Sequence, residues 1–167
     1  IYEALGIQTP KFAHMPMILG PDKSLLSKRH GATSVTQYKD EGYLADAMVN
    51  YLALLGWSYD DSQTVFHRQE LIDKFSLEKI SRNPAVFDQK KLIWMNGVYI
   101  RDLSIDELYQ LILPGWQKLG FLPKQPSEAE TIKGKLVVEA LRERAKLLND
   151  FNEQAYYFFQ DQLRYNE

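Results

Sequence analysis

Apolar side chains recur every three or four residues in several stretches of the chain, which is the pattern of an amphipathic helix. The helical stretches are a short one between Ser34 and Gly42, then residues 43–55, 70–75, 88–99, 104–112, 128–151 and the aromatic-rich 153–163. Serine or threonine stands just before a helical stretch at Thr33–Ser34, Ser104 and Ser127, where a hydroxyl can accept a free backbone N–H. Residues 104–107 also have the spacing of a capping box. The pattern therefore predicts a mainly α-helical protein of short helices joined by tight turns.

Four segments depart from the helical pattern. Residues 17–19 are apolar and lie between prolines, which predicts a short buried strand. Residues 22–32 carry basic and small polar side chains, with two leucines as the apolar anchors, and predict a loop. The pair Pro114–Gly115 predicts an interruption of the helix that begins after Ser104. Residues 121–126 contain two prolines and resemble a linker.

Composition excludes several classes of protein. The chain has 167 residues, of which 45% are hydrophobic and 25% charged, as in ordinary folded domains. It has no cysteine and three scattered histidines, so we expect no disulfide, no thiol nucleophile and no zinc site. No apolar run approaches the roughly 20 residues that cross a bilayer. We expect a cytoplasmic protein that does not bind membranes.

Charge is unevenly distributed, although the net charge is only −2. Residues 1–31 carry four basic and two acidic side chains, whereas residues 38–61 carry one basic and five acidic ones. An anionic ligand should therefore prefer the first segment. Within it, Lys28 and Arg29 follow Ser27 in a glycine-flanked loop, and paired cations of this kind can bind a polyphosphate. On composition alone, a solvated basic turn is the favoured explanation of the same residues.

The order of motifs along the chain resembles one enzyme family. Leu25-Leu26-Ser27-Lys28-Arg29-His30-Gly31 resembles the KMSKS signature loop of class I aminoacyl-tRNA synthetases, in the form found in bacterial glutamyl-tRNA synthetases. Four later segments also resemble this family in order and spacing, and together they extend the likeness over the chain. These segments are residues 34–44, 50–57, 87–101 and 151–161.

The resemblance implies an ATP-dependent reaction. Enzymes of this family activate glutamate with ATP and Mg²⁺ and then transfer it to the terminal ribose of tRNA(Glu). Lys28 matches the signature lysine that stabilises charge on the β- and γ-phosphates, so it is the expected catalytic residue. Arg29 and Lys23 are further candidates for ATP contact. Met17 and Ile18 match positions that hold the adenine through their main chain.

One signature position departs from the family pattern, and one expected region lies outside the sequence. Leu25 stands where the signature usually has its first basic residue, so that contact is either missing or supplied by Lys23. The nucleotide-binding half with the HIGH signature precedes the loop in such enzymes and is absent from these residues. We therefore expect a C-terminal fragment that begins just before the loop and is inactive alone.

The resemblance also implies a division into modules. Residues 1–22 match the end of the catalytic domain, 23–103 the loop and a helical stem-contact module, and 104–167 the first part of an all-helical anticodon-binding domain. A β-barrel in the last part would instead indicate a glutaminyl or archaeal-type enzyme. The alternative in another class is a stand-alone, non-catalytic tRNA-binding or scaffold module.

Candidate tRNA contacts are basic or amide side chains expected to protrude from rigid helices. In the stem-contact module they are Lys90, Lys91, Asn96 and Arg101, and in the last module they are Arg142 and Arg144. Both sets have a simpler explanation, because lysines often form a solvated face and Glu139 and Glu143 can pair with Arg142 and Lys146. We expect Trp57, Trp94, Trp116 and the aromatic run 156–159 to belong mainly to the core.

Overall fold

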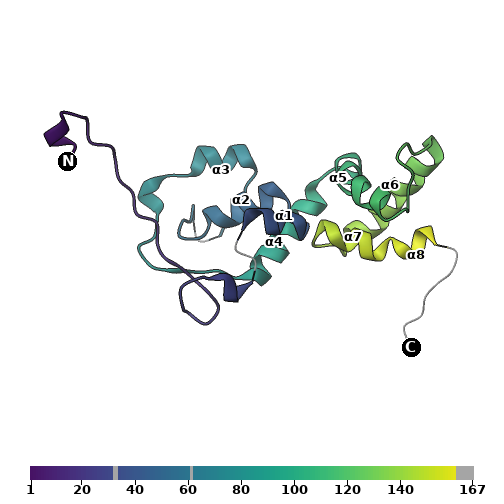
Figure 1. The fold of residues 1–167 in the computed structure, drawn as a ribbon, viewed down its shortest axis with the longest axis horizontal. Coiled ribbons are helices and arrows are strands. Elements are labelled where there is room, and N and C mark those ends of the chain that lie inside the picture. Colours follow the sequence, from purple (N-terminus) through teal and green to yellow (C-terminus); the bar gives the residue numbers. More distant parts are fainter. Residues whose placement is uncertain (32–33, 61, 161–167) are drawn as a thin grey trace.

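The protein, seen in a computed structural model, is a chain of short helices (Figure 1). One pair of very short strands accompanies them in the part of the chain that the structure describes. The structure describes residues 1–31, 34–60 and 62–160; Thr33 and the predicted helical residues 161–163 lie outside this part. The helices are α1 (Val35–Asp40), α2 (Ala45–Ala53), α3 (Arg68–Lys74), α4 (Gln89–Asp102), α5 (Ile105–Lys118), α6 (Glu128–Arg142), α7 (Leu148–Gln154) and α8 (Tyr156–Phe159). Short 3-10 turns cover Glu3–Leu5, Lys28–His30 and Leu77–Lys79. The prediction of a mainly α-helical fold is confirmed.

Local capping signals set the helix starts. The hydroxyls of Ser34, Ser104 and Ser127 accept backbone N–H groups of the first turn of α1, α5 and α6. The carboxylates of Glu107 and Glu130 accept the backbone N–H of their capping serines, which completes two capping boxes. Hydrogen bonds from these serines hold the pKa of both glutamates below its usual range.

The first helical core forms where α2 packs against α4, with α1 beside them. Its buried residues include Tyr51, Leu92 and Met95. Asn50 is 1% exposed, and its amide oxygen accepts the N–H of Phe66 at 2.9 Å while the Tyr99 hydroxyl lies 2.8 Å away. Burial raises the pKa of Tyr99 to about 12.

A second core is formed by α5, α6 and α7, which follow on the other side of the molecule (Figure 1). Trp116 and Phe151 are fully buried in it, and the Trp116 indole N–H donates to the carbonyl of Phe151 at 3.3 Å. The linker-like residues 121–126 belong to this core, because Leu122 is 4% exposed and packs with the same helices. They connect two helices of one core and do not separate two domains.

The predicted break at Pro114 was wrong, because α5 continues to Lys118 with this proline inside it. A proline within a helix costs about 3 kcal/mol or more. The burial of Trp116 offsets that cost, and Gly115 lies so close to the Asn152 amide that a Cβ at this position would stand 2.8 Å from its oxygen. Tertiary packing thus outweighs the local preference.

The prediction of one helix over 128–151 was also wrong. The chain leaves α6 after Arg142, turns at the fully buried Ala145 and starts again in α7. The Asp150 carboxylate stabilises the restart by accepting the N–H groups of Lys146 and Leu147 at 2.7 and 3.0 Å. This turn brings α7 against α5 and leaves Ile132 and Leu136 of α6 more than half exposed.

One amide connects the two cores. Asn96 of α4 is fully buried, its oxygen accepts the N–H of Leu44 at 2.8 Å, and its Nδ2 donates to the carbonyl of Lys146 at 2.6 Å. Leu44 precedes α2, and Lys146 lies in the turn before α7. Asn96 therefore joins three segments that are distant in the sequence.

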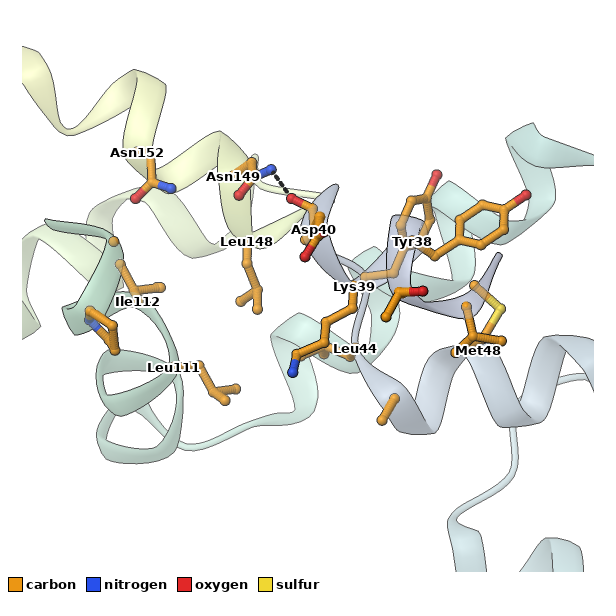
Figure 2. A pocket seen from close by; sticks show the side chains of 17 residues that line it. Tyr38, Lys39, Asp40, Leu44, Met48, Leu111, Ile112, Leu148, Asn149 and Asn152 are labelled. Atoms are coloured by element: carbon orange, nitrogen blue, oxygen red, sulfur yellow. Dashed lines mark hydrogen bonds between the residues drawn. The ribbon is translucent and has the colours of Figure 1, made fainter. Parts of the chain in front are cut away.

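An apolar cavity of about 860 Å³ lies beside this junction (Figure 2). Leu44 and Met48 line it on one side, and Leu111, Ile112 and Leu148 on the other. Asn149 spans the gap by donating a hydrogen bond to the carbonyl of Asp40 at 2.9 Å. The residues that line the cavity include none of the predicted site residues.

Within the described residues, no helix has the length and apolar character needed to cross a membrane.

Candidate functional site

The two strands present the basic loop. Strand β1 (Ile18–Leu19) pairs in parallel with β2 (Ala85–Val86), Ile18 opposite Ala85. The segment 85–86 has no strand pattern of its own, and sequence analysis missed it. β1 is partly exposed, and Met17 is 59% exposed, so the expectation of a buried strand was wrong. The carbonyls of Met17 and Ile18 accept the N–H groups of Ala85 and Leu26, each at 3.0 Å.

The loop after β1 is folded onto itself by the Asp22 carboxylate. Asp22 accepts hydrogen bonds from the Ser24 hydroxyl at 2.7 Å and from the Ser24 backbone N–H at 2.9 Å. The tight turn gives Lys23 a positive φ of 62°, a conformation that few residues with a side chain adopt. Leu25 then forms an antiparallel bridge with Leu19, and its side chain is 60% exposed.

The two basic residues of the predicted phosphate site differ in their surroundings. The Arg29 guanidinium donates to the Ser24 hydroxyl at 2.6 Å and lies 3.4 Å from the Asp22 carboxylate. The Lys28 side chain is exposed, and among the residues that the structure describes it has no hydrogen bond or ion pair. A lysine without an internal partner can place its whole charge on an incoming anion. Lys23 is equally exposed.

The His30 imidazole contacts both the Ser27 backbone and the Asp22 carboxylate. Its Nδ1 accepts the backbone N–H of Ser27 at 3.0 Å, and its Nε2 lies 3.2 Å from an oxygen of Asp22. The sequence predicts no metal site at the histidines and gives no signal for the contacts of His30, because these depend on how the loop folds back on Asp22 and the Ser27 backbone. The described residues contain no group of three or more His, Asp or Glu side chains that could hold a metal ion.

We expect the Asp22 carboxylate to stay largely ionised at pH 3.5, where a free aspartate, with a pKa of about 3.9, is mostly protonated. Hydrogen bonds from the Ser24 hydroxyl and N–H hold the pKa of Asp22 well below its usual range. Because the pKa of Asp22 is lower in the folded loop than in a free aspartate, the ionised carboxylate stabilises the loop at pH values above the ordinary pKa. This stabilisation is lost as the pH falls through the lowered pKa. A ¹³C titration of the Asp22 carboxyl carbon measures this. Ser24→Ala should raise the midpoint, and an ordinary midpoint in the unchanged protein would contradict the loop geometry.

The candidate RNA contacts on α4 divide into two kinds. Lys90, Lys91 and Arg101 keep exposed or half-exposed side chains, as expected. Asn96 does not protrude, and this part of the prediction was wrong. Its side chain is fully buried and both of its amide atoms bind backbone groups inside the protein, so it is not accessible to RNA.

Trp94 lies on the same helical turn as the two lysines. It is 47% exposed, so the expectation that it belongs to the core was wrong for this tryptophan and correct for Trp57 and Trp116. Positions 90, 91 and 94 are three and four residues apart and therefore share one face of α4. The exposed face of α4 thus combines an aromatic ring with two cations.

In the last module, residues 104–167, the two candidate arginines lie at the end of a helix and in the turn after it, not along one helix face. Arg142 is the last residue of α6, and its Nε lies 3.8 Å from the carboxylate of the neighbouring Glu143. Arg144 is exposed in the turn that follows. The aromatic run beyond is split, because Phe159 stacks on Phe121 while Tyr157 and Phe158 are 64% and 43% exposed. The expectation that the run belongs mainly to the core was wrong for Tyr157 and Phe158.

Comparison with known proteins identifies related sequences and folds. Residues 1–94 match the family described as tRNA synthetases class I (E and Q), catalytic domain. The chain is 47% identical over its whole length to the glutamate–tRNA ligase of Moorella thermoacetica and also to that of Carboxydothermus hydrogenoformans. It spans 34% and 35% of these two relatives, about a third of each.

A solved structure shows the same arrangement of helices. The crystal structure of a glutamate tRNA ligase from Elizabethkingia meningosepticum, in complex with its amino acid, superposes with a TM-score of 0.81 at 28% identity. The match covers 99% of this chain and 36% of that one.

Proposed function

Since the chain belongs to the class I tRNA synthetases for glutamate and glutamine, we propose that it supplies the ATP loop and the tRNA-binding helices of a cytoplasmic glutamate–tRNA ligase. The observation that carries this proposal is the loop 22–31, in which Lys28 is held exposed and unpaired while its neighbours are tied together. The relatives over the full length of the chain are named as ligases of this kind.

The reaction we propose has two steps. The carboxylate of glutamate attacks the α-phosphate of ATP, the bond to the β-phosphate breaks, and pyrophosphate leaves. The ribose hydroxyl at the 3′ end of tRNA(Glu) then attacks the activated carbonyl, and AMP leaves. Negative charge builds up on the departing phosphates in the first step, and a fixed cation stabilises it. Lys28 supplies that cation, and ATP arrives as its Mg²⁺ complex.

The other loop residues take supporting roles in ATP binding. Arg29 retains N–H groups beyond those bound to Ser24 and Asp22, since a guanidinium has five donors. Lys23 lies in the turn on the other side of Asp22, and it is the residue that can replace the basic contact absent at Leu25. The backbone of Met17 and Ile18 borders the adenine. Each of their carbonyls holds one hydrogen bond and has a second lone pair free.

We propose that residues 1–22 belong to a larger catalytic sheet. Parallel sheets are almost always covered on both faces. The two-stranded parallel sheet here leaves Met17, Leu25 and Val86 at 46–60% exposure. Further catalytic-domain chain, as found in the longer relatives, would cover this apolar surface. Residues 23–103 then form the stem-contact module and 104–167 the start of the anticodon-binding domain.

Lys90 and Lys91 are the proposed phosphate contacts of the stem-contact module, with Arg101 further along α4. Arg142 and Arg144 are the proposed contacts of the anticodon-binding module. We expect Lys90→Ala/Lys91→Ala to weaken tRNA(Glu) binding at 150 mM salt by about tenfold. The slope of log K against log salt should fall in magnitude by about two, because each phosphate contact releases about one counterion. Filter binding with the intact protein at several salt concentrations measures both effects.

The matched control is Lys118→Ala/Lys124→Ala, which removes two lysines that are also exposed but lie outside α4. This pair should leave the slope unchanged. Equal slopes for both double variants would show that the exposed face of α4 is only solvated.

The direct test of the proposed function is aminoacylation by the intact protein. Labelled glutamate should appear on tRNA(Glu) in the presence of ATP and Mg²⁺, and pyrophosphate should be released. A protein that binds tRNA(Glu) but forms no aminoacyl-tRNA would instead be a non-catalytic tRNA-binding module.

A further inference from the structure

The imidazole of His30 is enclosed although the loop around it is exposed. Its side chain is 9% exposed, and the ring packs against the backbone of Gly20. A Cβ at Gly20 would stand 2.7 to 3.0 Å from three ring atoms, so only glycine leaves room for the imidazole at this distance. The ring therefore has one position in this fold.

The hydrogen bonds of His30 determine which of its two ring nitrogens carries the proton. A backbone N–H is always a donor, so the Nδ1 that accepts from Ser27 at 3.0 Å carries no proton. The ring is then neutral with its proton on Nε2, which faces the Asp22 carboxylate at 3.2 Å. Asp22 is itself fixed by the hydroxyl and N–H of Ser24. His30 thus connects a fixed carboxylate to the backbone of Ser27.

That backbone position directly precedes Lys28. Ser27 is the N-cap of the turn Lys28–His30. The hydrogen bond from its N–H to the imidazole of His30 joins the start of this turn to its last residue. On the other side of Lys28, the Arg29 guanidinium is tied to Ser24. The lysine is therefore held by its two neighbours while its own side chain stays free.

On the basis of the proposed function, we propose that His30 is a positioning residue for glutamate activation: its neutral imidazole clamps the Ser27 backbone to Asp22 and so fixes the direction in which Lys28 meets the phosphates of ATP. The imidazole itself does not touch the substrate in this role. Its contribution reaches the reaction through Lys28 alone, and this makes it separable from a general effect on folding.

The test is a double-mutant cycle in the intact enzyme, read as the rate of ATP–pyrophosphate exchange with saturating glutamate and tRNA(Glu). His30→Ala should lower the rate about 10- to 100-fold, the size expected when a catalytic group is displaced by about an ångström. In a Lys28→Ala background the same change should have less than about a twofold effect, because residues that act through one another are not additive. Multiplicative losses would overturn the proposal.

Two conservative variants distinguish the clamp from simple space filling. His30→Asn places an amide oxygen near the position of Nδ1 and can still accept the Ser27 N–H, so it should restore most of the rate. His30→Gln reaches toward Asp22 but lacks an acceptor at the Nδ1 position and should not. Equal rates for the asparagine and alanine variants would contradict the proposal. His67→Ala, at an exposed histidine remote in sequence from the loop, is the control and should change nothing.

A second change leaves His30 in the sequence and displaces its ring. Gly20→Ala introduces a methyl group where the imidazole lies and should reproduce the loss seen with His30→Ala. ¹⁵N-histidine NMR of the unchanged enzyme should show an unprotonated Nδ1 and a protonated Nε2 for His30, assigned by its disappearance in His30→Asn. The opposite tautomer would overturn the clamp irrespective of activity. An unchanged enzyme that shows this tautomer but forms no aminoacyl-tRNA would refute the proposed function and not the clamp.

Discussion

Replacing Lys28 with alanine in the intact enzyme should slow glutamate activation by about 100- to 1,000-fold, the loss typical of removing one preorganised group that stabilises transition-state charge. Among the described residues the Lys28 side chain has no hydrogen bond or ion pair, whereas Arg29 is already bound to Ser24 and lies close to Asp22. The charge removed is therefore one that the substrate would otherwise receive in full.

The measurement is the single-turnover rate of pyrophosphate release with saturating ATP, glutamate and tRNA(Glu). Binding of tRNA(Glu), measured separately, should change little, because the lysine acts on the phosphates of ATP and not on the RNA. Lys118→Ala serves as the control for loss of a surface lysine. Near-normal activation by the Lys28 variant would refute the assigned role, while a parallel loss of tRNA binding would indicate a wider disturbance of the loop.

Replacing Asn96 with leucine should lower the free energy of unfolding of the 167-residue chain by about 2 to 6 kcal/mol, because two backbone groups lose their partner and each costs about 1 to 3 kcal/mol when left unsatisfied. The N–H of Leu44 and the carbonyl of Lys146 both depend on this one amide. Leucine has the same number of side-chain heavy atoms and the same branching, but its two methyl groups are larger than the amide atoms they replace, so overpacking adds to the loss of hydrogen bonds.

Urea unfolding of the chain measures this change. Asn149→Leu is the matched control, since it removes one exposed bond to the carbonyl of Asp40 and should cost less than about 1 kcal/mol. Asn96→Asp keeps the acceptor for Leu44 but places an oxygen against the Lys146 carbonyl, so it should also destabilise the protein. A leucine variant as stable as the control would show that Asn96 does not hold the two cores together.

Local signals in the sequence identified most helix starts and the basic loop. The capping serines Ser34, Ser104 and Ser127 act within one helical turn, so their effect does not depend on the rest of the fold. The carboxylate of Asp88 caps α4 in the same way. The position of the basic loop is also readable, because glycine and proline limit the local backbone whatever lies around it. The tRNA and ATP roles of individual residues remain predictions.

Contacts between distant residues decided what the sequence left open or suggested wrongly. Pro114 stays within a helix because Trp116 is buried against α7, and Asn96 turns inward because Leu44 and Lys146 need its two amide atoms. Strand 85–86 exists because β1 offers it hydrogen bonds from more than 60 residues away. Short-range preferences thus determined by themselves where helices begin and where the loop lies. Burial and the pairing of buried polar groups, which exist only in the folded chain, decided which side chains stay free to act.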